Sequence, residues 1–161
     1  MPTWRPPLGT PSYLTYLLVF GGAALACLVG AWRARYISNR GVRRGLVGLL
    51  LTSAAWATAH VGMLLSGPPW LKTVFYKAGL VVGFGTVWAW LWFCSAFSGR
   101  TLHRRRGPQA VAGTLFTLVT LTKLTNAWHG MYFSTGTVAE PFFHLTIDHG
   151  VLYWGTAAYS G

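Results

Sequence analysis

Three ionisable side chains lie inside long apolar stretches of the sequence: His60, Lys77 and Lys123. A lysine ammonium in a dry site can pair with an anion, and a histidine there needs a hydrogen-bond partner or a water-filled cavity. Ionisable residues within apolar membrane segments are costly, and they frequently mark the site of a ligand. These three residues are therefore the first candidates for a binding site.

Two polar residues extend this candidate site, since Asn126 and His129 follow Lys123 just after its apolar run ends. If the runs are membrane helices, His60, Lys77 and Lys123 all lie at a similar depth in the membrane, toward its outer side. We therefore expect a ligand pocket lined by His60, Lys77, Lys123, Asn126 and His129. For each lysine alone, the competing interpretation is snorkelling, in which the stem stays in lipid and the ammonium reaches the headgroups.

Aromatic residues near the same ends have a simpler interpretation. Trp70, Tyr76, Trp128 and Tyr132 are expected to form an aromatic belt at the membrane interface. Trp56 precedes His60 by four residues, so the two side chains share one face of the predicted helix.

A metal site is an alternative near the end of the chain. His144 and Asp148 are four residues apart and His149 is adjacent, and such ligands at helical spacing can bind zinc. Paired membrane histidines can also ligate haem, but only His60 lies clearly inside an apolar run. Because neither ligand set is complete, the sequence predicts no metal and no cofactor.

Catalytic chemistry has few candidates in this chain. The only acidic residues are Glu140 and Asp148, and there is no Gly-rich nucleotide loop. His103, in LHRRRGP, has a proline five residues later, which is the spacing of a kinase phosphoacceptor box. It lacks the acidic neighbour that serves as general base in such a box. We therefore expect that this chain is not itself an enzyme.

The elements that position these residues are predicted from composition. Of 161 residues, 53% are hydrophobic and 9% are charged, against about a quarter charged in soluble domains. The first four apolar runs approach or exceed the roughly 20 residues that a transmembrane helix needs. We predict an all-α integral membrane bundle forming one domain over 1–161. It has four complete transmembrane helices and the start of a fifth, at about 13–32, 45–66, 73–97, 110–125 and 149–161.

The net charge of +11 is explained by membrane topology and not by nucleic-acid binding. Most arginines lie in two short segments between apolar runs, 33–44 and 98–108. Loops rich in arginine and lysine face the cytoplasm. We therefore expect an N-terminus outside and a multi-pass protein of the cell (plasma) membrane.

The last apolar segment, 149–161, would form about 20 Å of helix, which is shorter than a bilayer core of about 30 Å. We therefore expect the chain to be a fragment of a longer protein. Small residues at Gly22, Ala26 and Gly30, and the GxxxG pair Gly79 and Gly83, allow close helix contacts. Packing within the bundle is the favoured interpretation, and a homodimer face is the alternative.

Four segments carry a family resemblance. LKTVFYKAG (71–79) and WLWFCSAFSGR (90–100) frame the third run, LTKLTNAWHGMYF (121–133) ends the fourth, and HGVLYWGTAAYS (149–160) opens the fifth. In this order and spacing they resemble the seven-helix N-terminal sensor region of histidine kinases. The resemblance implies a seven-helix bundle, N-terminus outside, followed by cytoplasmic signalling modules. The present sequence lacks helices six and seven.

These observations predict the membrane-embedded sensor region of a histidine-kinase-like receptor, which passes a ligand or membrane signal to cytoplasmic modules. The expected partners are the lipid bilayer, a small ligand, those modules in cis, and a second copy if the small residues form a dimer face. A small membrane transporter or channel component, or a haem- or metal-binding membrane protein, is the alternative.

Overall fold

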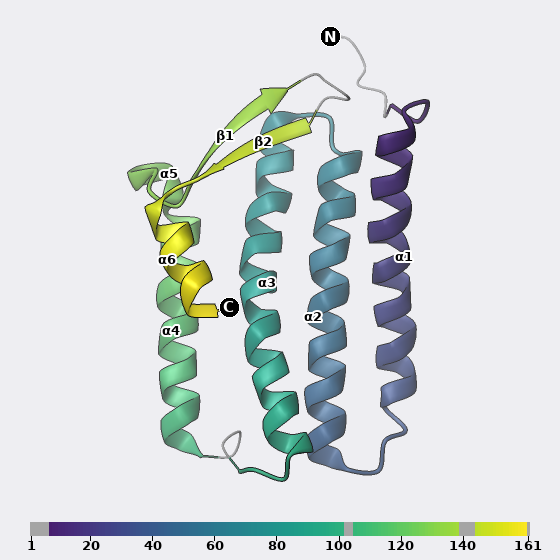
Figure 1. Cartoon of the computed structure of the whole chain (residues 1–161), viewed down its shortest axis with the longest axis vertical. Helices are drawn as coiled ribbons and strands as arrows, with labels where there is room; N and C mark the ends of the chain where they lie inside the picture. Colours follow the sequence, from purple (N-terminus) through teal and green to yellow (C-terminus); the bar gives the residue numbers. More distant parts are fainter. Residues whose placement is uncertain (1–6, 102–104, 139–143, 161) are drawn as a thin grey trace.

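The computed structural model describes residues 7–101, 105–138 and 144–160 of the chain. Helices α1 (Pro11–Ala34), α2 (Arg40–Leu65) and α3 (Pro69–Phe97) stand side by side, and α4 (Arg106–Leu124) follows beyond α3 (Figure 1). Next come the short α5 (Asn126–His129), strands β1 (Phe133–Val138) and β2 (His144–His149), and α6 (Val151–Ser160). The predictions made for His103, Arg104 and Glu140 fall outside the described residues.

The bundle has two chemically different ends. The hairpin end holds the turn from α2 to α3, the strands β1 and β2, the start of α1 and the end of α4 (Figure 1). The arginine end holds the turn from α1 to α2 and the segment from α3 to α4. All arginines in the described ranges belong to this second end: Arg33, Arg35, Arg40, Arg43, Arg44, Arg100, Arg105 and Arg106.

Three helices are long and apolar enough to cross a membrane: α1, α2 and α3, with 24, 26 and 29 residues. They extend past the predicted runs because flanking polar residues continue each helix beyond its apolar core. Helix α4 has 19 residues and carries several threonines, so it falls below the same apolarity criterion. The fourth complete span and the orientation in the membrane stay predictions.

Local sequence signals explain where the long helices begin and end. Pro11 and Pro69 occupy the first helical position of α1 and α3, where the missing proline N–H costs nothing. The Asn39 side-chain oxygen caps α2 by accepting from the backbone N–H of Gly41 at 3.0 Å and Val42 at 3.2 Å. Gly99, at φ +70°, supplies the left-handed turn that follows the end of α3.

Small residues bring α2 and α3 together. Ala59 is buried on α2, and a Cβ added at Gly45 would lie 2.6 Å from the Cα of Phe93 on α3. The predicted GxxxG pair on α3 also packs within the bundle, since Gly79 meets Ala59 and His60, and Gly83 meets Trp56. This outcome confirms the intramolecular interpretation for α3.

The stripe on α1 behaves differently from the pair on α3. Gly30 packs against Leu50, whereas Gly22 and Ala26 are exposed. A dimer face at these two positions stays a prediction.

Large apolar side chains cover the outside of the bundle. Leu18 is 73% exposed and Leu25 66% exposed, and the apolar windows of α1, α2 and α3 are only 11–17% buried. A soluble protein does not present contiguous apolar surface on this scale. The exposed faces are therefore suited to lipid.

The segment predicted as a loop, roughly 127–148, contains a helical turn and an antiparallel hairpin. β1 pairs with β2 from Phe133 opposite His149 to Val138 opposite His144. The last helix consequently begins at Val151 and not at His149. The mostly helical fold agrees with the predicted class, with this hairpin as an addition.

The hairpin also removes the geometry that a metal site required. His144 and Asp148 lie on a strand, so they do not have the helical spacing assumed for a shared ion. In the described ranges, no three His, Cys, Asp or Glu side chains are grouped closely enough to hold a metal.

Candidate functional site

Lys123 lies in the last turn of α4 and is buried, with 4% of its surface exposed. Its Nζ donates a hydrogen bond to the backbone oxygen of Leu80 on α3, at 3.0 Å. Snorkelling is therefore the wrong interpretation for Lys123, because its ammonium turns into the bundle and not toward the headgroups. This bond directly links α4 to the middle of α3.

Aromatic rings form the remaining surroundings of the Lys123 ammonium. Nζ lies 4.5 Å from the centroid of Phe84 and 5.6 Å from that of Tyr132, which are cation–π distances. Asp148, the only acid among the described residues, is exposed on β2. One carbonyl and two ring faces thus provide the contacts of a buried cation that can donate up to three hydrogen bonds.

Asn126 fixes the turn that brings Tyr132 to this place. Its side-chain oxygen accepts from the backbone N–H of Tyr132 at 2.8 Å and of Phe133 at 3.2 Å, and its Nδ2 donates to the Phe133 oxygen at 2.6 Å. Asn126 is only 6% exposed. Three hydrogen bonds from one buried amide hold the end of α4 against the start of β1.

His129 supports the same turn from its other side. Its Nε2 is 3.1 Å from the Thr122 oxygen, and its Nδ1 accepts from the backbone N–H of Met131 at 3.1 Å. These contacts assign the ring proton to Nε2. Gly130 next to it has φ +63°, the left-handed conformation that ends α5.

His60 belongs to an aromatic cluster between α1 and α2. Its ring stacks on Phe20 with centroids 4.6 Å apart and lies 4.4 Å from Trp56. Its Nδ1 is 3.0 Å from the Trp56 oxygen. The prediction that Trp56 and His60 share a face is confirmed, and the required polar partner is this backbone carbonyl.

A cavity of about 170 Å³ lies beside Lys123. Its walls come from α2, α3, α4, the residue before β1, and α6. They include Trp56, Gly83, Phe84, Lys123, Tyr132 and Tyr153. The cavity therefore touches most of the elements at the hairpin end of the bundle.

Of the five predicted site residues, Lys123 lines this cavity and the other four do not. Asn126 and His129 shape the turn before Tyr132, and His60 packs on Trp56, so these three lie behind wall residues. Lys77 is half-buried on α3. The cavity thus combines one predicted residue with walls that the others support.

Sequence reasoning missed the contributions of Tyr132 and Lys72. Tyr132 was expected in the aromatic belt, but it is 2% exposed. Lys72 was expected in the loop between runs, but it lies in the first turn of α3, is 2% exposed, and donates to the Met63 oxygen at 3.0 Å. The adjacent prolines Pro68 and Pro69 were the available signal, since proline is favoured where a helix starts.

Comparison with known proteins gives one match. A family model described as the N-terminal 7TM region of histidine kinase matches residues 16–161. No curated protein and no solved structure matches the chain. The family is the N-terminal input region of these kinases and not their catalytic part. With nearly its whole length matched, and with three apolar helices of membrane-spanning length, the chain belongs to the N-terminal 7TM region family of histidine kinases.

Proposed function

We propose that this chain is the signal-input region of a histidine-kinase-like receptor and that the cavity beside Lys123 binds a small organic anion. The observation that carries the proposal is the buried Lys123 ammonium, whose contacts among the described residues are a single carbonyl acceptor and two ring faces. A buried cation gains strongly from a charge-assisted hydrogen bond to an anion.

The walls of the cavity favour a small ligand with an apolar part. Phe84, Tyr132 and Tyr153 supply aromatic surface, and about 170 Å³ is the space of a few water molecules at about 30 Å³ each. A short-chain or aromatic carboxylate fits this description. Asn126, His129 and His60 act in this proposal by holding Tyr132 and Trp56, and Lys77 adds positive charge outside the cavity.

The position of the cavity suggests how binding would be passed on. A ligand there contacts residues of α2, α3, α4 and α6 at once. It therefore stabilises the packing in which these helices are closest to it, and a shift between two packings is the general basis of such signalling. The output goes to cytoplasmic modules in cis.

The proposed orientation follows the charge of the two ends. The arginine end faces the cytoplasm and the hairpin end faces outside, because basic segments between membrane helices remain on the cytoplasmic side. The cavity then opens toward the external medium, where a small anion is available.

The test is a calorimetric titration of propionate and benzoate into the purified protein in detergent, with propionamide as the neutral analogue. We expect the Lys123→Met variant to lose at least about tenfold in affinity for both acids, because its charge-assisted hydrogen bond is gone. The matched control is Lys77→Met, which should bind within about twofold of the parent.

Two results would overturn the proposal. One is propionamide binding as tightly as propionate, which would show that charge plays no role. The other is an equal loss of affinity in Lys77→Met and Lys123→Met, which would place the effect in the general positive potential of this end.

A further inference from the structure

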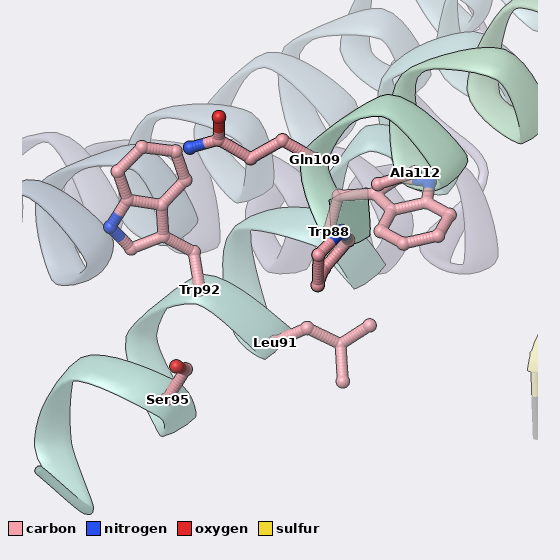
Figure 2. Close-up of a pocket in the computed structure, with 7 residues that line it drawn as sticks. Trp88, Leu91, Trp92, Ser95, Gln109 and Ala112 are labelled. Atoms are coloured by element: carbon pink, nitrogen blue, oxygen red, sulfur yellow. The ribbon is translucent and has the colours of Figure 1, made fainter. Parts of the chain in front are cut away.

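A second cavity lies at the arginine end, between the last turns of α3 and the first turns of α4. Its volume is about 440 Å³, which is within the range of about 300–1,000 Å³ for ligand sites. Its walls include Trp88, Leu91, Trp92, Ser95, Gln109 and Ala112. Figure 2 shows these side chains reaching from two helices into one space, with Gln109 extended toward Trp92.

Apolar and polar side chains line different parts of this cavity along the bundle. Trp88, Leu91 and Ala112 lie farther from the arginine end, whereas Ser95 and Gln109 lie nearer the ends of their helices. Ser95 also donates a hydrogen bond from Oγ to the Arg100 oxygen at 3.3 Å. This bond keeps the backbone of Arg100 next to the cavity.

Exposed arginines lie close in sequence to Ser95 and Gln109, the polar residues of this cavity. Arg100, Arg105 and Arg106 are exposed, and Gln109 follows Arg105 by one helical turn. In the described part of the chain, the N-terminus of α4 has no side-chain cap and no acidic residue in its first turn. The helix dipole at such an end favours an anionic group.

The start of α2 is a natural comparison, because it is equally basic. There Asn39 caps the helix, and Arg43 donates to the backbone oxygens of Arg35 and Ile37 at 3.4 Å each. This helix end therefore satisfies its own polar groups. The start of α4 combines arginines with an uncapped terminus and an apolar cavity.

We infer that the groove between α3 and α4 at the arginine end binds one anionic phospholipid. Its phosphate lies against Arg100, Arg105 and the N-terminus of α4, and one acyl chain lies along Trp88 and Leu91. Basic pockets between membrane helices recognise anionic headgroups in this way. The inference rests on a different cavity from the one beside Lys123 and does not depend on the organic-anion site.

The test is native mass spectrometry of the detergent-purified chain titrated with phosphatidylglycerol or phosphatidylcholine of identical acyl chains. We expect one phosphatidylglycerol per chain, bound at least about tenfold more tightly than phosphatidylcholine. The double variant Arg100→Gln/Arg105→Gln should reduce this preference to about twofold or less. Its matched control, Arg40→Gln/Arg44→Gln, changes two exposed arginines at the start of α2 and should keep the preference.

A second variant tests the apolar part of the site. Ala112→Phe places a ring in the groove and should abolish the binding of phosphatidylglycerol. Circular dichroism checks that the helices of this variant are intact. If the site bound an adventitious ion only, inorganic phosphate would compete with phosphatidylglycerol as strongly as a second phospholipid does. A second copy in the groove would appear as a dimer that Ala112→Phe dissociates.

Either of these outcomes overturns the inference, and so does an equal affinity for the two lipids. An equal loss of the preference for phosphatidylglycerol in the two arginine double variants would also overturn the inference. It would show that the preference depends on the total charge of the chain and not on this groove. If Ala112→Phe unfolds, the two arginine variants still decide the question, since they alter exposed side chains only.

Discussion

The two sides of α3 are packed by different means. On the side of α2, glycine and alanine let the backbones approach, as at Gly45 and Phe93. On the side of α4, the Lys123 side chain donates a hydrogen bond to the backbone of α3 at the hairpin end, and a cavity is left at the arginine end. Two helices whose backbones are in close contact can pack in only one way. Two helices that are joined by a few hydrogen bonds and separated by a cavity can shift relative to each other. The α3–α4 side is therefore the one on which the proposed ligand would act.

The largest expected effect is on the α2–α3 side. Gly45→Ala places a Cβ 2.6 Å from the Cα of Phe93, and only a shift of the helix backbones can relieve this contact. We expect the free energy of unfolding to fall by about 3 kcal/mol, measured by titration with sodium dodecyl sulfate followed by circular dichroism.

Gly48→Ala is the control for this substitution, because its added Cβ meets the Cβ of Ala89 at an ordinary 4.0 Å. Alanine also favours the helix by up to about 1 kcal/mol over glycine. If both variants changed the free energy of unfolding equally, the close contact at Gly45 would not be what stabilises the α2–α3 interface.

A smaller effect is expected on the α4 side. Asn126→Ala removes three hydrogen bonds and leaves the N–H groups of Tyr132 and Phe133 without their acceptor. We expect a loss of about 2 kcal/mol. Hydrogen exchange should rise at these two amides and stay unchanged in α2.

Asn126→Asp is the control for this second substitution, because it keeps an acceptor oxygen for the two amides and replaces the Nδ2 donor by a carboxyl oxygen. It should retain protection of the two amides. Uniformly faster exchange through α2 and α3 in Asn126→Ala would contradict the view that the two sides of α3 are separable.

The smallest effect is expected from Tyr76 on α3. Its buried hydroxyl has no hydrogen-bond partner among the described residues, and its ring packs edge-on to Phe133 with centroids 5.0 Å apart. Tyr76→Phe should leave stability unchanged or raise it by up to about 1 kcal/mol, in the same unfolding titration.

Tyr13→Phe provides the opposite case on the α1–α2 side. The Tyr13 hydroxyl donates to the Leu64 oxygen at 3.3 Å, so its removal should lower stability by about 1 kcal/mol. A greater loss in Tyr76→Phe than in Tyr13→Phe would mean that the α3–hairpin contact is the more tightly organised one.

The apolar helices were predictable from sequence because each long run has one physical explanation in a chain with so little charge. α1, α2 and α3 followed from apolar length alone. The hairpin was not predictable, because the residues 133–138 alternate too weakly to indicate a strand. Their pairing with β2 also depends on partners 6 to 16 residues away along the chain.

The sequence indicated some residues of the candidate site, but not the contacts that each of them makes. Lys123 and Asn126 stood out because polar groups at the end of an apolar run need partners. That the partner of Lys123 is a backbone oxygen on α3, 43 residues earlier, depends on how two helices pack. Tyr132 entered the cavity wall only because the Asn126 turn reverses the chain, and such a turn has no signal in residue type alone.

The bond from Lys123 to the main chain of α3 has a consequence for how this region can change over time. Every residue type offers the same backbone oxygen, so position 80 can be replaced without removing the acceptor, whereas position 123 requires a long cationic donor. The hydrogen bond between α4 and α3 therefore does not depend on which side chains neighbour it on α3. A lineage can therefore alter the wall residues of α3, and with them the selectivity of the proposed ligand site, while the attachment of α4 is inherited intact.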